Sequence, residues 1–168
     1  GSHEEAPAVR VIHYAGAEVM GGLLAHVQIL ARELIVSGHE VSVILSPASA
    51  IDGAAEACAR GGAGVERLTV KGKGDLAGMA ALGRMIERGR PDIFHVHLSS
   101  PIEAIPAILA ARVGGARHIV TTEHAPTWLP LERSYSRVAK KAACRIVDRV
   151  IAVCRSDAWF LQERFGIS

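Results

Sequence analysis

Two adjacent glycines follow the first apolar run of the chain and precede a helical pattern. Residues 9–12 supply the apolar run, Gly21 and Gly22 the loop, and apolar residues recur at helical spacing over residues 23–34. In open α/β sheets a loop at the carboxyl end of a strand is where ligands bind, and the free amides of the following helix favour an anion. Because glycine has no Cβ, a phosphate or a sugar can approach this main chain closely. The spacing matches neither the dinucleotide fingerprint nor the Walker loop.

His124 stands directly after a predicted strand and next to Glu123. A histidine at a strand tip that faces a phosphate-binding loop could donate a hydrogen bond to a substrate hydroxyl or to developing charge. Glu18, in the first loop, is placed similarly. The alternative for His124 is an ordinary loop histidine that binds nothing.

His95 and His97 stand two residues apart in another predicted strand, so their side chains share one face. Such a pair could hold a metal ion if His124 completed the set. No acidic residue or cysteine has a matching spacing. We therefore favour buried histidines that are hydrogen-bonded at a strand end, and we predict no metal site.

A basic run follows further along the chain, at Arg133, Arg137, Lys140 and Lys141, near the spacing of one helix face. Such a face could contact anionic lipid head groups or a phosphorylated acceptor, as a peripheral membrane contact. A solvated helix face is the alternative, and the spacing alone favours it.

The composition describes one globular domain without a nucleic-acid partner. The chain has 168 residues, 49% of them hydrophobic and only 4% aromatic, which is typical of an aliphatic core between a sheet and helices. A formal net charge of +2 is too small to indicate nucleic-acid binding. Three cysteines without metal-like spacing suit a reducing cytoplasm. Residues 1–3 resemble the remnant of a cleaved tag, which leaves a domain over residues 4–168.

Strand-like and helix-like segments alternate along the whole chain, which predicts a mostly parallel sheet of about six to seven strands in a Rossmann-like three-layer αβα sandwich. The expected strand order is 3-2-1-4-5-6, which brings the ends of strands one, four and five together. Those ends carry the double glycine, Ser99 with Ser100, and Glu123 with His124. The predicted strands are residues 9–12, 40–45, 65–70, 92–97, 118–122 and 147–153, and the predicted helices are residues 22–36, 51–60, 76–87, 99–113, 131–144 and 156–165.

Four stretches together resemble a known family. GG-x-x-x-HV with the following L-A-x-E-L-x-x-x-GHEVSV (residues 21–43), PDIFHVH (91–97), VTTEHAP (120–126) and VDRVIAVCRSDAWFLQERFGI (147–167) are similar, in order and spacing, to the N-terminal domain of family-4 retaining glycosyltransferases with the GT-B fold. Two positions depart from the family pattern: Leu24 stands where a glutamate is common, and Cys154 stands where a serine is.

The resemblance implies two Rossmann-like domains that face each other across a cleft. The N-terminal domain binds a glycan, lipid or small-molecule acceptor, and a C-terminal domain binds most of the nucleotide-sugar donor. Gly21 and Gly22 would lie against the donor diphosphate, and His124 would contact the transferred sugar as the catalytic residue. Glu18, Ser99, Ser100, Glu123 and Trp128 would line the acceptor side. No metal or other cofactor is implied, because helix amides and basic side chains hold the diphosphate.

The chain stops where the family continues into the donor domain, so we expect an isolated acceptor-side domain without transferase activity of its own. The expected location is the cytoplasm or the inner membrane face. Two alternatives stay open: a stand-alone module that binds a phosphorylated small molecule, and half of a nucleotide-sugar epimerase.

Overall fold

The chain forms one parallel sheet that is covered by helices on both faces. The structure is a computed structural model that describes residues 7–99, 103–124 and 134–167, without the side chains of residues 134–137. Its strands are β1 (Arg10–Ala15), β2 (Glu40–Leu45), β3 (Gly64–Arg67), β4 (Ile93–Leu98), β5 (His118–Glu123) and β6 (Arg149–Ala152). Its α-helices are α1 (Gly22–Val36), α2 (Asp52–Arg60), α3 (Leu76–Gly89), α4 (Ile105–Val113), α5 (Ser134–Cys144) and α6 (Arg155–Phe165), and a short 3-10 turn, η1, spans Ser49–Ile51.

The strand order is β3-β2-β1-β4-β5-β6, and all the pairs are parallel, which confirms the predicted order. The order reverses between β1 and β4, so the loops after these two neighbours leave toward opposite faces of the sheet. In register, His13 of β1 lies opposite His95 of β4, and His97 lies opposite Thr122 of β5. The topology therefore gathers His13, His95 and His97 at the centre of the sheet.

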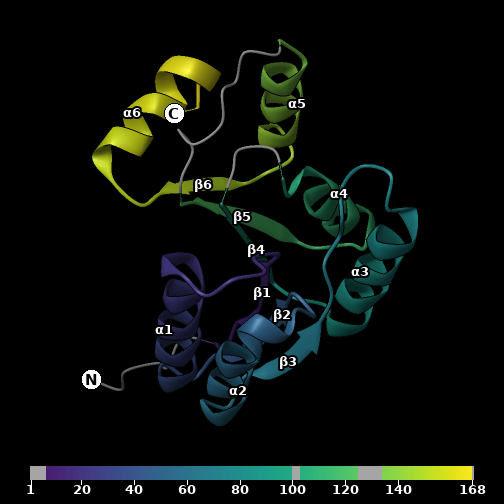
Figure 1. Ribbon diagram of the computed structural model, residues 1–168, viewed down its shortest axis with the longest axis vertical. Coiled ribbons are helices and arrows are strands. Elements are labelled where there is room, and N and C mark those ends of the chain that lie inside the picture. Colours follow the sequence, from purple (N-terminus) through teal and green to yellow (C-terminus); the bar gives the residue numbers. More distant parts are fainter. Residues whose placement is uncertain (1–6, 100–102, 125–133, 168) are drawn as a thin grey trace.

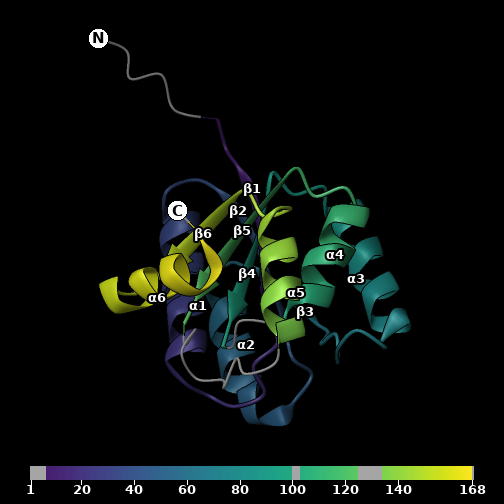
Figure 2. The same ribbon diagram turned by 90° about the horizontal axis from the view of Figure 1, so that it is seen from above.

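Helices cover both faces of the sheet, as Figures 1 and 2 show, and separate apolar clusters hold the two helix layers against it. On one face, Leu24 and Val27 of α1 and Ile51 of η1 pack with aliphatic residues of β1 and β2. On the other face, α3 and α4 bury Leu82 and Ile108 with residues of the central strands. The small residues of α3 and α4 let these two helices approach closely. Both faces of the central strands are thus buried, which explains their almost continuous apolar sequence.

Local signals set the ends of the helices as predicted for α1 and α3. The helix α1 ends at Val36, and Gly38 follows with a φ of +84°, a conformation that glycine adopts without a steric penalty. At α3, the side chain of Asp75 accepts a hydrogen bond from the Gly78 amide at 2.9 Å, which is the predicted cap. Two main-chain bonds, from Lys71 and Gly78, lower the pKa of the Asp75 carboxyl.

The prediction that a helix starts at Ser99 was wrong. Within the described residues α4 begins at Ile105, and Pro106 rather than Pro101 occupies its first turn. The backbone amide and the hydroxyl of Ser99 instead donate to the Glu103 carboxylate, each at 2.7 Å. These two bonds give the Ser99 amide and hydroxyl a side-chain partner at Glu103, and the helix begins two residues after that partner. The predicted strands at residues 65–70 and 147–153 are also shorter in the structure.

The predicted basic face is wrong at Lys140. Its side chain is only 2% exposed and pairs with the buried carboxylate of Glu123, so it cannot contact a membrane. Lys141 is exposed. Arg133 and the side chain of Arg137 lie outside the described residues. Within the described part of the chain, no helix has the length and apolarity to cross a membrane.

Candidate functional site at the carboxyl end of the sheet

The first part of the site is the N-terminus of α1. Gly21 caps this helix with an extended backbone, and no acidic residue occupies the first turn. Within the described residues, the helix has no side-chain cap. A Cβ built on Gly21 or Gly22 meets no protein atom within 4 Å. Among the described residues, no atom therefore crowds the main chain on the side where a Cβ of these two residues would stand. A free helix N-terminus favours an anion in that space.

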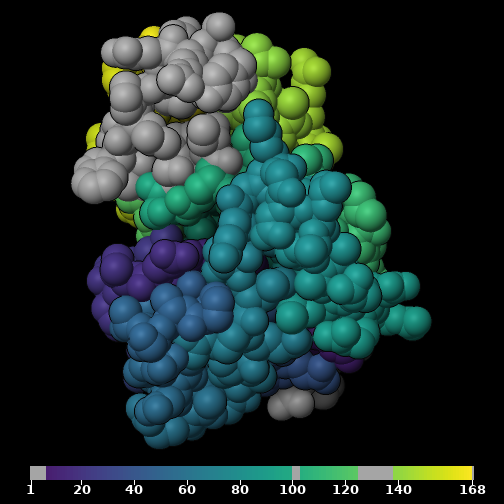
Figure 3. Space-filling view, turned by 45° about the vertical axis from the view of Figure 1, so that its right-hand side comes forward, coloured from purple at the N-terminus to yellow at the C-terminus, as the bar shows by residue number. Residues whose placement is uncertain are grey.

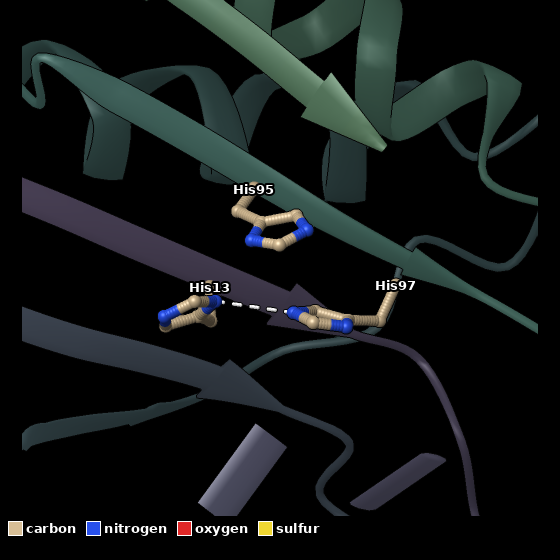
Figure 4. A group of neighbouring side chains, drawn as sticks. All are labelled: His13, His95 and His97. Carbon is tan, nitrogen blue, oxygen red and sulfur yellow. Dashed lines mark hydrogen bonds between the residues drawn. The ribbon is translucent and has the colours of Figure 1, made fainter. Parts of the chain in front are cut away.

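The second part is a row of imidazole side chains beside that helix end. His13 from β1 and His95 and His97 from β4 are buried together, as Figure 4 shows. Nδ1 of His13 lies 3.1 Å from Nε2 of His97, and Nδ1 of His97 lies 3.3 Å from Nε2 of His124. His124 is only partly buried, so this chain of contacts runs from the core to the rim. It gives His97 a partner on each side and fixes the orientation of its ring.

Two further contacts complete the cluster. Nε2 of His95 lies 2.7 Å from the Thr122 hydroxyl, which fixes the His95 ring. His26 of α1 is exposed, and its ring stands nearly perpendicular to that of His124, at a centroid distance of 5.2 Å. Within the described residues, Nε2 of His13 is buried without a hydrogen-bond partner, which is unusual for a polar atom in a core.

Four of the imidazoles are neutral at neutral pH because burial lowers their pKa, namely those of His13, His95, His97 and His124. Burial lowers the pKa of His13 to about 3 and that of His95 to about 4, and neighbouring histidines add to both effects. The pKa of His97 is lowered well below its usual range for the same reasons. Burial and the neighbouring His26 lower the pKa of His124 to about 4. A neutral imidazole can donate or accept a hydrogen bond without bringing a charge into the site.

The third part is a buried ion pair behind His124. The Glu123 side chain is 1% exposed and that of Lys140 is 2% exposed, and the Lys140 ammonium donates to the Glu123 carboxylate. Burial raises the pKa of Glu123, and the Lys140 charge opposes that rise. The pair ties α5 to the end of β5. Glu123 thus faces Lys140 rather than open solvent.

The fourth part is a cavity of about 610 Å³ on the other face of the sheet, toward α3 and α4. Its wall is mainly apolar, with Met79 and Leu109 among its side chains, and His97 forms part of its floor. The Tyr14 hydroxyl accepts a bond from the Val70 amide at 3.0 Å and keeps its own proton to donate. One wall of the cavity comes from the segment around residues 68–80. Figure 3 shows the outer surface of this segment in teal. The remaining lining residues are Gly16, Thr69, Lys71, Gly72, Lys73, Glu103, Ala104, Ile105, Pro106 and Ala139.

The structure brings some of the predicted site residues together and leaves others apart. Gly21, Gly22 and His124 border the same rim, and exposed Ser99 follows β4 at that end. Glu18 lies in the exposed loop before α1, where it makes no hydrogen bond or ion pair with another described residue. Ser100 and Trp128 lie outside the described residues.

Sequence reasoning missed His13 and His26. His13 sits in an apolar strand, where alternation with Val11 puts it on the same face as a core residue. His26 follows Gly22 by one helical turn, which is the spacing that points a side chain back toward the helix start. Both signals are visible in the sequence, but only the sheet order shows that they converge on His97.

Comparisons with known proteins agree with this architecture. A glycosyltransferase from Rickettsia africae is similar over 97% of the chain and 41% of its own length, with 17% identity and a TM-score of 0.72. Anabaena HepE, in complex with UDP and glucose, matches 94% of the chain and 40% of its own, with 14% identity and a TM-score of 0.67. A structure described as a UDP-N-acetylglucosamine 2-epimerase from Listeria monocytogenes matches 94% and 42%, with 17% identity and a TM-score of 0.64. No curated protein matches the chain.

The fold defines a Rossmann-like α/β domain, and the histidine-lined rim lies at its topological switch point, where open sheets of this kind bind ligands. The chain spans about two fifths of the length of the similar structures. The model of Glycosyltransferase Family 4 matches residues 20–168, and the chain belongs to that family.

Proposed function

We propose that this chain is the acceptor-binding half of a glycosyltransferase that transfers a sugar from a nucleotide-sugar donor with retention of configuration. One observation carries the proposal: the open α1 N-terminus, the His124 ring and an apolar cavity that reaches His97 all meet at the carboxyl ends of the central strands. Membership of the glycosyltransferase family supports glycosyl transfer as the reaction of the parent protein. The similar structure of HepE holds UDP and glucose, which suggests a nucleotide sugar as the donor class.

In this proposal the residues have distinct roles. The free amides at Gly21 and Gly22 bind the donor diphosphate, since they are positively polarised and unobstructed. His124, neutral at the working pH, forms a hydrogen bond to the transferred sugar and stabilises charge as it develops. His97 holds the His124 ring in place from behind. The other donor contacts come from a second domain, so the isolated chain turns over no substrate.

The cavity receives the acceptor. Its apolar walls suit an apolar portion of the acceptor, while Tyr14 and the otherwise unpartnered Thr69 hydroxyl offer hydrogen bonds among the described residues. Because His97 touches both the cavity and His124, an acceptor seated there lies next to the proposed reaction centre. A cytoplasmic location, where the unpaired cysteines stay reduced, is part of the same proposal.

The test uses the polypeptide that joins these residues to a donor domain. Leu109 is 44% exposed at the cavity, and Leu76 is 73% exposed away from its lining. We expect Leu109→Arg to raise KM for the acceptor by about tenfold or more, the effect of losing about 1.4 kcal/mol of binding, and to leave the donor KM unchanged. Leu76→Arg is the matched control and should change neither. Equal effects of the two variants would remove the cavity from the proposal.

An epimerase is the second candidate function, because one similar structure carries that description. An epimerase converts the nucleotide sugar without an acceptor, whereas a transferase releases nucleoside diphosphate in step with acceptor glycosylation. Product analysis with and without acceptor therefore separates the two activities. A stand-alone binding module would bind a phosphorylated ligand at the α1 N-terminus and give neither product.

A further inference from the structure

The histidines at the rim are also placed as the ligands of a metal ion would be, apart from the transfer roles proposed above for His97 and His124. Within the described residues, two groups of three have ligand nitrogens that all lie within 4.8 Å of one another: His13, His95 and His97 in the core, and His26, His97 and His124 at the rim. Both groups contain His97, so we expect the two groups together to bind at most one ion. The ring geometry decides between the two groups.

The core group is poorly arranged for a metal ion. The rings of His95 and His97 are stacked, with centroids 4.2 Å apart and planes at 29°. An imidazole nitrogen binds a metal along a lone pair that lies in the plane of its ring. In stacked rings these lone pairs run side by side and do not meet at one point. His95 moreover uses Nε2 to contact Thr122.

The rim group is well arranged. Its centroids lie 5.2 Å apart for His26 and His124, 5.6 Å for His97 and His124, and 5.7 Å for His26 and His97. The ring planes are inclined by 37° to 73°, so no two of these rings are stacked. Two nitrogens bound tetrahedrally to zinc, each at about 2.0–2.1 Å, are about 3.3 Å apart. Nδ1 of His97 and Nε2 of His124 are 3.3 Å apart already.

The protonation and surroundings of these ligands also fit. A metal ligand must be a neutral imidazole, and burial lowers the pKa of both His97 and His124. If Nδ1 of His97 binds the ion, Nε2 carries the ring proton and donates it to Nδ1 of His13 at 3.1 Å. Bound histidines commonly donate their second nitrogen in this way, which fixes the tautomer. His26 is exposed, so a fourth position faces solvent.

We propose that His26, His97 and His124 bind a divalent transition-metal ion such as Zn²⁺, with a fourth position open to water or an oxyanion. The ligand type selects the metal, because imidazole suits zinc, copper or nickel and not magnesium or calcium. The open position faces the rim that also carries the α1 N-terminus. His97 and His124 also have roles in the proposed transfer, but metal binding by the purified chain is measured without a transfer assay.

The test is a metal titration of the purified chain after removal of any affinity tag and treatment with a chelator. Co²⁺ serves as the spectroscopic probe, since tetrahedral coordination gives intense visible absorption, and Zn²⁺ then displaces it. We expect one ion per chain and a tetrahedral spectrum. His26→Ala, a change at an exposed position, should weaken binding by more than about tenfold, because the loss of even a second-sphere partner costs 10- to 100-fold.

Two further variants make the outcome decisive. His118→Ala is the matched control, since His118 is exposed and lies away from the rim, with its Nδ1 3.9 Å from a carboxylate oxygen of Asp148. It should bind the ion as the parent chain does. His95→Gln tests the core group and should also leave the affinity unchanged, provided that circular dichroism shows a folded chain. The proposal is overturned by absence of binding at micromolar Co²⁺ and Zn²⁺, by equal losses in His26→Ala and His118→Ala, or by a loss in His95→Gln without one in His26→Ala.

Discussion

We predict that breaking the buried ion pair between Lys140 and Glu123 lowers the stability of the fold by a large, measurable amount. Replacing Lys140 by methionine keeps the length of the side chain but leaves Glu123 in the core without its partner. Both side chains are at most 2% exposed, so water cannot take over the lost contact. Removal of one member of a buried pair costs about 3–5 kcal/mol. For a chain of this size, about 2–4 °C per kcal/mol corresponds to a melting temperature lower by about 6–20 °C.

The pH dependence of this loss follows from the carboxyl that remains. Burial raises the pKa of Glu123, and the Lys140 charge that opposed the rise is gone in the variant. A carboxyl whose folded pKa lies above its unfolded pKa stabilises the fold while it is protonated, and this contribution is lost as the pH rises through the folded pKa. The deficit of Lys140→Met should therefore be smaller at pH 5 than at pH 8.

Thermal and urea unfolding of four proteins provide the measurement: the parent chain, Lys140→Met, Glu123→Gln and the double variant. The double variant removes both charges, and we expect it to be more stable than Lys140→Met. Lys141→Met is the matched control, because Lys141 is exposed, and it should stay within about 0.5 kcal/mol of the parent chain. A deficit of Lys140→Met that is as small as that of the control, and equal at both pH values, would refute the buried pair.

Two other predictions concern the core. Acid should destabilise the chain as the pH falls below about 6.5, the pKa of an unfolded histidine, because the pKa of His13 in the folded state is lowered to about 3 and the folded chain cannot take up this proton. At pH 5 this histidine alone should lower the free energy of unfolding by about 2 kcal/mol. His13→Gln should therefore flatten a plot of melting temperature against pH, measured in a buffer that contains a chelator. A Cβ at Gly114 would lie 2.7 Å from the Gly83 carbonyl oxygen of the neighbouring helix, so Gly114→Ala should lose about 1–3 kcal/mol in urea unfolding, whereas the control Gly53→Ala, which meets nothing within 4 Å, should lose none.

Most of the fold could be predicted from the sequence, but less of the candidate site could. Alternating segments and glycine or proline stops predicted the strand order and the bounds of α1, because each of these signals is local and the right-handed crossover then leaves few topologies. The start of α4 was missed because Ser99 with Pro101 two residues later has the pattern of a helix cap and first turn, whereas the Ser99 hydroxyl bonds to Glu103 and the helix begins at Ile105.

The site depended on contacts between distant residues. Helical spacing placed Lys140 with its basic neighbours, but its burial follows from Glu123 lying within reach across the fold. His13 lies 84 residues from His97, and only the pairing of β1 with β4 joins them. Such contacts are set by packing, and no local pattern encodes them.

The most direct test of the proposed function is a transfer assay on the polypeptide that joins these residues to its donor domain. It would be given a panel of nucleotide sugars, beginning with UDP-glucose, and acceptors with an apolar portion. We predict acceptor-dependent release of nucleoside diphosphate, a glycosylated product with the anomeric configuration of the donor, and loss of turnover in His124→Ala but not in His118→Ala. An epimerised donor without any glycosylated acceptor, or full turnover in His124→Ala, would contradict the account.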